Sequence, residues 1–484
     1  MQRFPQSSSR RWLTLTIVCF AMLMNTLDQT IVNVALPAIQ RDLRFDQASL
    51  AWVVDAYLVA FGGSLLLAGR LGDLVGRKKV FLSGLALFTA MSLVCGLADS
   101  QVMLIAARFF QGVGAALSSS VIIAIIVTEF AEPVERAKAM GAYIVVSVGG
   151  GSIGLLLGGI LTQLVGWHWN FFINLPIGVA TMLAGRALIQ ENEGLGFGRG
   201  LDVAGSVLAT AGPMLGIYAI VESNQGSWTS LRTIAAGAAA LLLIPLFLFL
   251  QARLSNPIMP LHVFHARGLL SSSVVRGLTI VGMYATFFLG ALYMQHVLGY
   301  DTIHTGLAFL PTTMAVLALS LGVTRRIMGY LGAKPTVMLG LGILLAGLIV
   351  FARASQHSSY FPYLLVGFLL VGLGGGTMFT PLLTIAIADV PVHDAGLASG
   401  IINVSQNVAA AVGIALLSTI SSTYSQGLVS HGYDQLRALN DGYQAGFVVA
   451  ASSVALALIL AGLTLHGERA VEEDDLPAEL AAAA

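Results

Sequence analysis

Three charged side chains, those of Asp28, Asp55 and Arg108, lie within long apolar stretches of the sequence. An ionisable group in hydrocarbon costs several kcal/mol unless it is paired or faces a polar cavity, so such residues are functional candidates. In a low dielectric a carboxyl group favours its neutral form, whereas a neighbouring guanidinium favours the carboxylate. Two aspartates that share one arginine can therefore titrate separately. The three residues predict a site that takes up and releases a proton, which a bound cation would displace.

Helix geometry predicts that the three residues lie at one depth. In helices that rise about 1.5 Å per residue, Asp28 lies roughly 13 Å and Asp55 roughly 10 Å from the outer ends of their helices, with Arg108 at a similar depth. We expect Arg108 to compensate one carboxylate while the other carries the proton. The alternative is a buried ion pair that only holds helices together.

The composition indicates that the helices holding these residues are membrane helices. Of the 484 residues, 56% are hydrophobic and only 10% are charged, whereas about a quarter of the residues in a soluble domain are charged. The formal net charge of zero provides no field that would attract nucleic acid. Cys19 and Cys95 fall inside apolar runs, which favours small buried hydrophobic residues over a disulfide or a metal site. We expect an all-α polytopic membrane protein.

Apolar segments of about twenty residues, enough to cross about 30 Å of hydrocarbon, recur along the chain. An even count of fourteen places both termini on one side of the membrane. Most of the 24 Lys and Arg residues then fall on that side, which the positive-inside rule identifies as cytoplasmic. The predicted spans are 12–37, 48–70, 80–98, 101–127, 138–164, 170–189, 201–222, 231–252, 269–297, 304–326, 335–353, 361–388, 396–421 and 443–465.

A basic stretch between the second and third predicted spans combines glycines, cations and one aspartate. We expect it to form a short cytoplasmic loop. Its motif residues are Gly69, Arg70, Gly72, Asp73, Gly76, Arg77 and Lys78.

The sequence also contains an internal repeat. A degenerate copy of the basic stretch follows the second of the last six spans, with Gly329 in place of Asp73, and Val371–Gly374 mirrors Gln111–Gly114 at an offset of about 260 residues. The repeat predicts two six-helix halves on either side of a two-helix insert. The predicted divisions are 1–192 for the first half, 193–265 for the insert, 266–466 for the second half and 467–484 for a disordered cytoplasmic tail.

The fifth predicted span carries Gly150, Gly154 and Gly158 at four-residue spacing, with Gly159 beside them. This spacing lets another helix approach closely. A GxGxxG match in the same run has no strand before it, so it does not predict a dinucleotide site, and the chain contains no Walker A sequence. We expect no cofactor; the energy source would be a proton gradient.

As a set, these motifs resemble those of the fourteen-helix drug:proton antiporter family of the major facilitator superfamily. The resemblance implies the major facilitator fold, a role for Arg108 in proton transfer, and a latch in which Asp73 contacts the other half on the cytoplasmic side. One departure is Leu155, because the family usually has proline at this position and the fifth helix would lack the resulting kink. The segments that carry the resemblance are Leu27–Pro37, Trp52–Tyr57, Gly69–Lys79, Arg108–Gly114, the fifth-span glycines and Trp167–Pro176.

This resemblance implies a proton-coupled antiporter, not an enzyme, that exports amphiphilic or cationic drugs and antibiotics across the cytoplasmic (inner) membrane by alternating access. Its partners would be the lipid bilayer, small-molecule substrates and protons, with no nucleic acid; accessory periplasmic partners stay open. Met283, Tyr284 and Phe287 could line an adaptable pocket, and Arg276 could join them or extend to the membrane surface. The alternatives are a dedicated exporter of one endogenous metabolite or antibiotic, and a non-transporting membrane sensor on a transporter fold.

Overall fold

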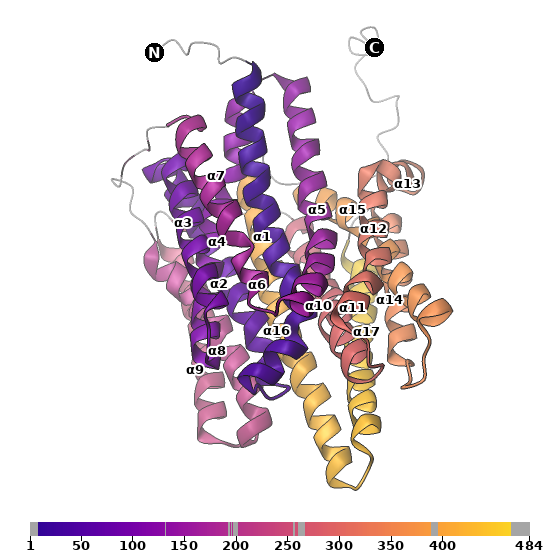
Figure 1. Cartoon of the computed structure of the whole chain (residues 1–484). Coiled ribbons are helices and arrows are strands. Elements are labelled where there is room, and N and C mark those ends of the chain that lie inside the picture. Colours follow the sequence, from indigo (N-terminus) through magenta and orange to yellow (C-terminus); the bar gives the residue numbers. More distant parts are fainter. Residues whose placement is uncertain are drawn as a thin grey trace.

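The computed structural model describes residues 8–130, 132–191, 194, 196, 202–254, 257–259, 267–388 and 395–465. These residues form a bundle of helices that run roughly parallel to one long axis (Figure 1). The tail predicted at 467–484 and parts of the connections around the insert lie outside the described residues.

The first part of the bundle consists of six long helices and one short helix. Ser100 caps the start of helix α4, because its side chain accepts a hydrogen bond from the Met103 amide, the usual role of serine at a helix N-terminus. The helices are α1 (Ser8–Leu43), α2 (Trp52–Val75), α3 (Arg77–Gly96), α4 (Gln101–Glu129), α5 (Pro133–Leu164), α6 (Trp169–Phe172) and α7 (Asn174–Leu188).

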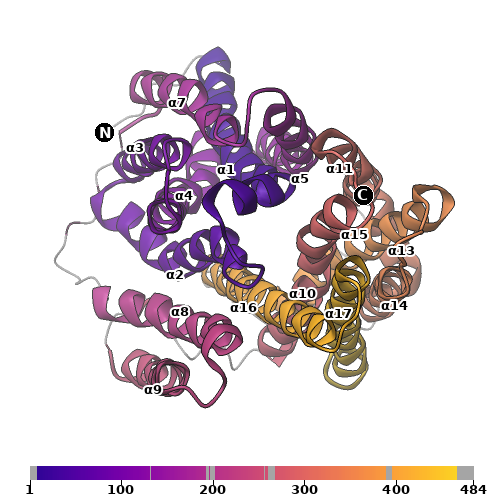
Figure 2. The same cartoon turned by 60° about the horizontal axis from the view of Figure 1, so that its bottom comes forward.

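The next two helices, α8 (Val203–Gly226) and α9 (Leu231–Arg253), form a hairpin at the edge of the bundle. Helix α8 packs on α2 and α16, and α9 packs on α8 (Figure 2). The hairpin corresponds to the predicted two-helix insert, and its second helix presents many apolar side chains outward.

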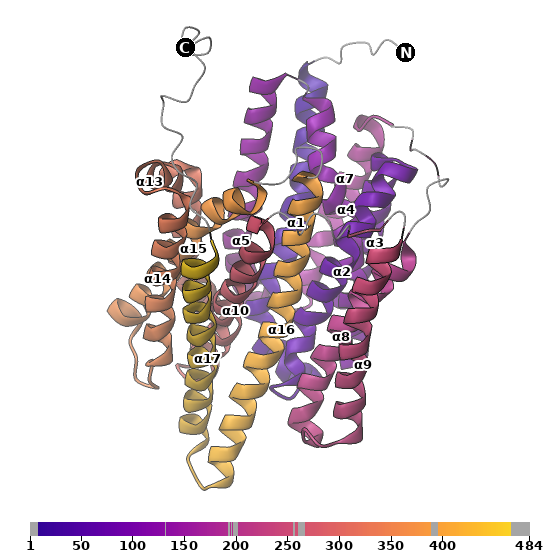
Figure 3. The same cartoon turned by 180° about the vertical axis from the view of Figure 1, so that it is seen from behind.

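The last part of the bundle contains the remaining helices. Seen from behind, α16 lies between α17 and α2, so it joins the two larger parts (Figure 3). The helices are α10 (Arg267–His296), α11 (Thr302–Ala308), α12 (Leu310–Ala318), α13 (Thr324–Leu331), α14 (Ala333–Ala352), α15 (Leu365–Ile387), α16 (Ala395–Ser430) and α17 (Gln435–Thr464).

Each of the fourteen predicted spans overlaps one or more of the described helices. By length and composition, 12 helices in the described ranges could cross a membrane, and Ser49–Val75, bent by 47°, would be one more. The tenth predicted span is instead divided among α11, α12 and α13, with a π-helical turn at Leu319–Val323 in which Gly322 has a φ of 132°. The chain is therefore a multi-pass membrane protein with 12 or 13 spans that meet these criteria.

The prediction of a loop at Gly69–Lys79 was wrong in extent. Helix α2 continues to Val75 and α3 begins at Arg77, so only Gly76 lies outside a helix. Gly76 has a φ of 112°, a conformation that glycine adopts without steric cost. Hydropathy marks where hydrocarbon ends, but a helix can continue into water, and here the charged residues lie on the helix ends.

The internal repeat is visible in how the helices cross. A β-carbon on Gly114 would lie 2.5 Å from the amide nitrogen of Phe88, and one on Gly374 would lie 2.5 Å from the amide nitrogen of Leu344. The pair α3–α4 and the pair α14–α15 therefore use the same close, glycine-dependent crossing. Gly332, at the start of α14, also repeats the positive φ of Gly76.

The two larger parts meet at the end of the bundle opposite Gly76, where α1 ends at Leu43; we call this the Leu43 end. Gln295 Nε2 donates to the Val34 carbonyl at 2.9 Å, and Ser418 Oγ donates to the Gln47 carbonyl at 2.6 Å. Among the described residues, every hydrogen bond between the two parts lies at this end. The start of α1 and the end of α17 both lie at the opposite end (Figure 1).

Candidate functional site

The structure brings Asp28 and Arg108 into direct contact. Asp28 lies on α1 and Arg108 on α4, and Arg108 Nη1 is 2.5 Å from Asp28 Oδ2. Both side chains are buried, with exposed fractions of 0% and 1%. Such a pair is stable only when the remaining polar atoms are also satisfied, because desolvation of two charges is costly.

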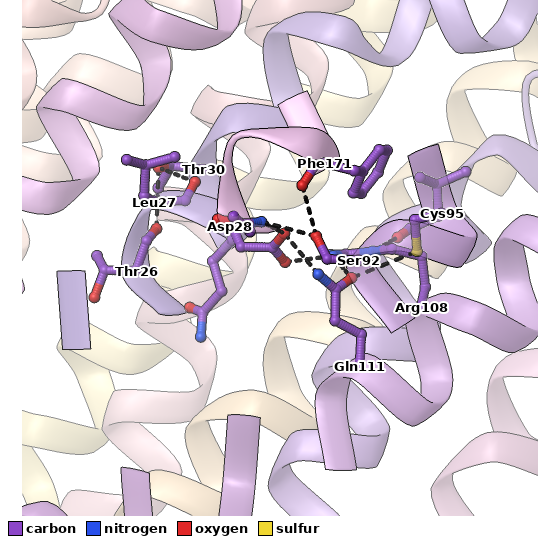
Figure 4. Close-up of polar contacts among 12 residues, drawn as sticks. Thr26, Leu27, Asp28, Thr30, Ser92, Cys95, Arg108, Gln111 and Phe171 are labelled. Atoms are coloured by element: carbon purple, nitrogen blue, oxygen red, sulfur yellow. Dashed lines mark hydrogen bonds and ion pairs between the residues drawn. The ribbon is translucent and has the colours of Figure 1, made fainter. Parts of the chain in front are cut away.

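Amide side chains satisfy the rest of this pair. Asp28 Oδ1 accepts hydrogen bonds from Gln111 Nε2 and Asn174 Nδ2, both at 2.9 Å (Figure 4). Arg108 Nη1 also donates to Gln111 Oε1 at 2.9 Å, and Asn174 Nδ2 donates to Ser92 Oγ at 3.1 Å. The network thus ties together α1, α3, α4 and α7.

Helix α2 contributes backbone and aromatic contacts to Arg108. Arg108 Nε donates to the Val53 carbonyl at 2.9 Å, and the guanidinium carbon lies 4.4 Å from the ring centroid of Tyr57. A cation above an aromatic face is stabilised by the ring quadrupole. The arginine is therefore held from several sides and has little freedom to move.

Asp55 has a different environment from Asp28. It lies on α2, two residues after Val53, and is 0% exposed. Neither carboxyl oxygen has a hydrogen-bond partner among the described residues. A negative charge here would be uncompensated and costly, whereas a proton or a bound cationic group would remove that cost. The predicted proton site thus divides into one fixed ion pair and one isolated carboxyl group.

The motif residues around Gly76 have described contacts with the first part of the chain. Arg77 Nη2 is 3.8 Å from Asp73 Oδ1, and Arg77 Nη1 donates to Thr128 Oγ1 on α4 at 2.7 Å. A β-carbon on Gly72 would lie 2.5 Å from Val121 Cγ1 on α4. Gly69 has open space around its α-carbon, and Arg70 and Lys78 are partly exposed. In this state Asp73 forms its ion pair with its own half, not the contact expected with the other half.

The glycines of α5 face two neighbours. At Gly154 a β-carbon would lie 2.9 Å from the Leu27 carbonyl oxygen, and at Gly158 it would lie 2.6 Å from that of Ile31; Gly150 likewise faces α1, at Leu23 and Thr26. The predicted close approach is confirmed, with α1 as the partner. Gly159 faces the other way, towards Thr302 of α11, whose Oγ1 donates to the Gly159 carbonyl at 2.9 Å. Helix α5 runs as one helix through Leu155.

The predicted pocket residues of α10 separate into two groups. Phe287 lies 5.4 Å from Phe309, centroid to centroid, and Met283 packs against α15 at Gly375. Arg276 lies further along α10, where Nε donates to Gln406 Oε1 at 2.8 Å. Tyr284 is partly buried on α10. In the described part of the chain, no hydrogen bond or ring contact links Arg276 to Phe287 or Phe309.

Sequence reasoning gave no role to Gln111, Asn174 or Ser92. Gln111 follows Arg108 by three residues, which places both on one helix face, and this spacing was a usable signal. Asn174 lies in a segment quoted only for its resemblance, and nothing in the sequence aligns it with Asp28. Cys19 and Cys95 are buried and free, as predicted.

Comparison with known proteins gives consistent relatives. Puromycin resistance protein pur8 of Streptomyces alboniger is 35% identical over 454 residues, covering 93% of this chain and 90% of that protein. Cephamycin export protein CmcT of Amycolatopsis lactamdurans is 34% identical, covering 86% and 87%. Multidrug resistance protein Stp of Mycobacterium tuberculosis is 34% identical, covering 85% and 76%.

Solved structures support the fold alone. The crystal structure of the nucleoside transporter NupG has a TM-score of 0.64 at 13% identity, covering 94% of this chain and 100% of that chain. A bacterial homologue of the human lysosomal transporter Spinster, in an inward-facing and unoccupied conformation, has a TM-score of 0.66 at 13% identity, covering 95% and 98%. The family model described as Major Facilitator Superfamily matches residues 18–414 and 326–483. The chain belongs to the Major Facilitator Superfamily.

Proposed function

We propose that this chain is a proton-coupled antiporter that exports amphiphilic or cationic drugs and antibiotics across the cytoplasmic membrane by alternating access. The observation that carries the proposal is the contrast between Asp28, whose charge is fully matched, and Asp55, whose carboxyl group is buried without a partner. Family membership and the names of the three relatives support export as the activity.

Asp55 is the proton carrier in this proposal. When protonated, the carboxyl group is neutral and suits its dry surroundings. When a cationic substrate binds between the two halves, it replaces the proton as the partner of the Asp55 carboxylate, and the proton is released. When Asp55 is protonated again, the substrate loses this partner and dissociates. Arg108 and Asp28 keep a fixed charge balance beside the site, because their network leaves neither charge unpaired.

The contacts between the two larger parts support alternating access. The Leu43 end is closed by hydrogen bonds between them, which supports a state open to the opposite, cytoplasmic end. In the alternate state the cytoplasmic ends close, and Asp73 exchanges its pairing with Arg77 for a contact with the other half. We expect Asp73→Asn to abolish transport while the protein remains in the membrane.

The proposed function also includes a topology and a division into domains. We infer fourteen spans, with the bent α2 as the second and the broken unit α11–α13 as the tenth, and both termini on the cytoplasmic side. The two halves, 1–192 and 266–466, rock against each other as transporter repeats do, with protons and lipid as the remaining partners.

A dedicated exporter of one compound is the second candidate. Two of the relatives are named for single antibiotics, puromycin and cephamycin, whereas the third is named for multidrug resistance. A panel of structurally unrelated dyes and antibiotics separates the two candidates: efflux of several supports a multidrug exporter, and efflux of one supports a dedicated exporter.

Ethidium efflux from proteoliposomes with an imposed pH gradient tests the proposal. Wild-type protein should export the dye only while the gradient persists, and Asp55→Asn should abolish this dependence. The matched control is Asp99→Asn, which neutralises an exposed carboxylate between α3 and α4 and should transport normally. Gradient-independent transport across the whole panel would contradict proton coupling.

A further inference from the structure

Arg276 is a cation inside a membrane-crossing helix. It follows the start of α10 by nine residues, about 13 Å along the axis, within the apolar helical span Gly268–His296. A cation at this position is costly unless a specific partner or a polar cavity compensates it.

The partners of Arg276 in the structure are neutral. Its Nε donates to Gln406 Oε1 on α16 at 2.8 Å, and its guanidinium carbon lies 5.0 Å from the ring centroid of Phe379 on α15. No carboxylate among the described residues forms an ion pair with it, and its two Nη atoms donate to none of these residues. Two nitrogens of the guanidinium fork are thus free to bind a ligand.

The side chain faces the seam between the halves and not the lipid. Val274, which is 45% exposed, lies on nearly the opposite side of α10, and Leu270, which is 54% exposed, lies about a third of a turn away from Arg276, since each residue turns the helix by about 100°. Arg276 points instead to α15 and α16. Helix α16 packs on α2 of the first half, and a β-carbon on Gly62 of α2 would lie 3.0 Å from Asn407 Cβ, next to the Gln406 that holds Arg276.

A guanidinium group whose two Nη atoms have no protein partner favours one class of ligand. Two parallel N–H groups match the oxygens of a carboxylate, phosphate or sulfonate and bind them bidentately. The adjacent ring of Phe379 offers an apolar face for the rest of an amphiphilic molecule. Arg108 offers no comparable site, because it is 1% exposed and already paired with Asp28, and its Nε and Nη1 also donate to the Val53 carbonyl and Gln111.

We propose that Arg276 binds the acidic group of the transported substrate and selects amphiphiles that carry one. This inference rests on the proposed export function and adds to it a preference for amphiphiles that carry an acidic group, zwitterions included, over purely cationic ones. The location of Arg276 towards the start of α10, the proposed cytoplasmic side, makes it a contact on the entry path. In a zwitterion the cationic group would reach Asp55 later in the cycle.

A matched pair of dyes tests the assignment: a rhodamine with a free carboxylate and its methyl ester. In proteoliposomes with an imposed pH gradient, wild-type protein should transport the acid with the lower KM. Arg276→Gln should raise the KM for the acid at least about tenfold, because a bidentate charged pair is lost, and should change the KM for the ester less than about twofold. Arg276→Lys, which keeps the charge but not the fork, should fall in between.

The control variant is Arg253→Gln. Arg253 is exposed at the end of α9, and its guanidinium carbon lies 4.5 Å from the ring centroid of Phe249, so the change removes the same kind of cation from a site outside the seam. It should change the transport of neither dye.

An equal loss of transport for both dyes with Arg276→Gln would overturn the assignment in favour of a structural role. A loss for both that depends on the anionic lipid content of the vesicles would overturn it in favour of a lipid headgroup. Wild-type transport of the ester but not the acid would refute the inference and leave the export function intact, and transport of neither dye would contradict the export function.

Discussion

Arg108 and Phe368 occupy corresponding places in the two halves, about 260 residues apart, each just before the glycines at which its helix crosses the neighbouring one. In the first half, this place holds a buried guanidinium surrounded by a carboxylate, amides and a backbone carbonyl. In the second half it holds a buried ring, 5.1 Å from the centroid of Phe309 and 4.9 Å from that of Phe351.

The difference shows which features of the repeat are constrained by the fold. The close crossings need glycine in both halves because the backbones are in contact, so that feature is retained. The side chain beside the crossing only has to fill space and satisfy its polar atoms, so it is free to diverge. One half thus carries the fixed charges beside Asp55, while the other provides an aromatic interior and the isolated Arg276.

The largest expected effect comes from removing the charge in the first half. Arg108→Met leaves the Asp28 carboxylate buried without its counter-ion and should lower the free energy of unfolding by roughly 3–5 kcal/mol. The corresponding Phe368→Leu only trims an apolar core and should cost about 1–2 kcal/mol. Thermal unfolding of the detergent-solubilised proteins measures both.

The double variant Asp28→Asn/Arg108→Met provides the control for this pair. It removes both charges together, so it should recover most of the stability lost in Arg108→Met. A double variant no more stable than Arg108→Met would show that the ion pair is not the origin of the difference between the halves.

The crossings should respond alike in the two halves. Gly114→Ala and Gly374→Ala each place a β-carbon 2.5 Å from a backbone nitrogen of the neighbouring helix, and each should cost about 1–3 kcal/mol through overpacking. Gly149→Ala, in open space on α5, is the matched control and should be neutral or slightly stabilising. A large asymmetry between Gly114→Ala and Gly374→Ala in the unfolding temperature would mean that the repeat is not structural.

The smallest effect concerns the aspartates that accept backbone hydrogen bonds just before the second helix of each half. Asp46 Oδ1 accepts from the Ser49 amide at 2.8 Å, and Asp301 Oδ1 accepts from the His304 amide at 2.7 Å. Asp46→Ala and Asp301→Ala should each cost about 1 kcal/mol.

The cap of the second half adds a pH dependence to this prediction. The backbone amide of His304, helped by its side chain, holds the pKa of Asp301 below its ordinary value of 3.8. A lowered carboxyl pKa stabilises the fold above the ordinary value, and this stabilisation is lost as pH falls through the lowered value. The difference in stability between wild type and Asp301→Ala should therefore be constant at neutral pH and shrink in strong acid. A difference that grew in acid would contradict this cap.

Much of the fold and part of the candidate site could be predicted from the sequence. Hydropathy located the 12 or 13 helices that could cross a membrane, and helix depth alone brought Asp28 and Arg108 to one level, because rise per residue fixes height. Height says nothing about the direction in which a side chain points, so it could not tell which aspartate pairs with Arg108 or that amides surround Asp28. The end of α2 was misplaced because a helix need not stop where hydrocarbon does, and the break at Gly322 was missed because composition alone does not reveal a local change of helix type.

The most direct test of the central claim is proton release on substrate binding. Purified protein in weakly buffered detergent solution is mixed with a transported cationic dye, and a pH indicator reports the protons released. Wild type and Asp99→Asn should release protons, and Asp55→Asn should bind the dye weakly and release none. Undiminished proton release from Asp55→Asn would contradict the account and move the proton site to another residue.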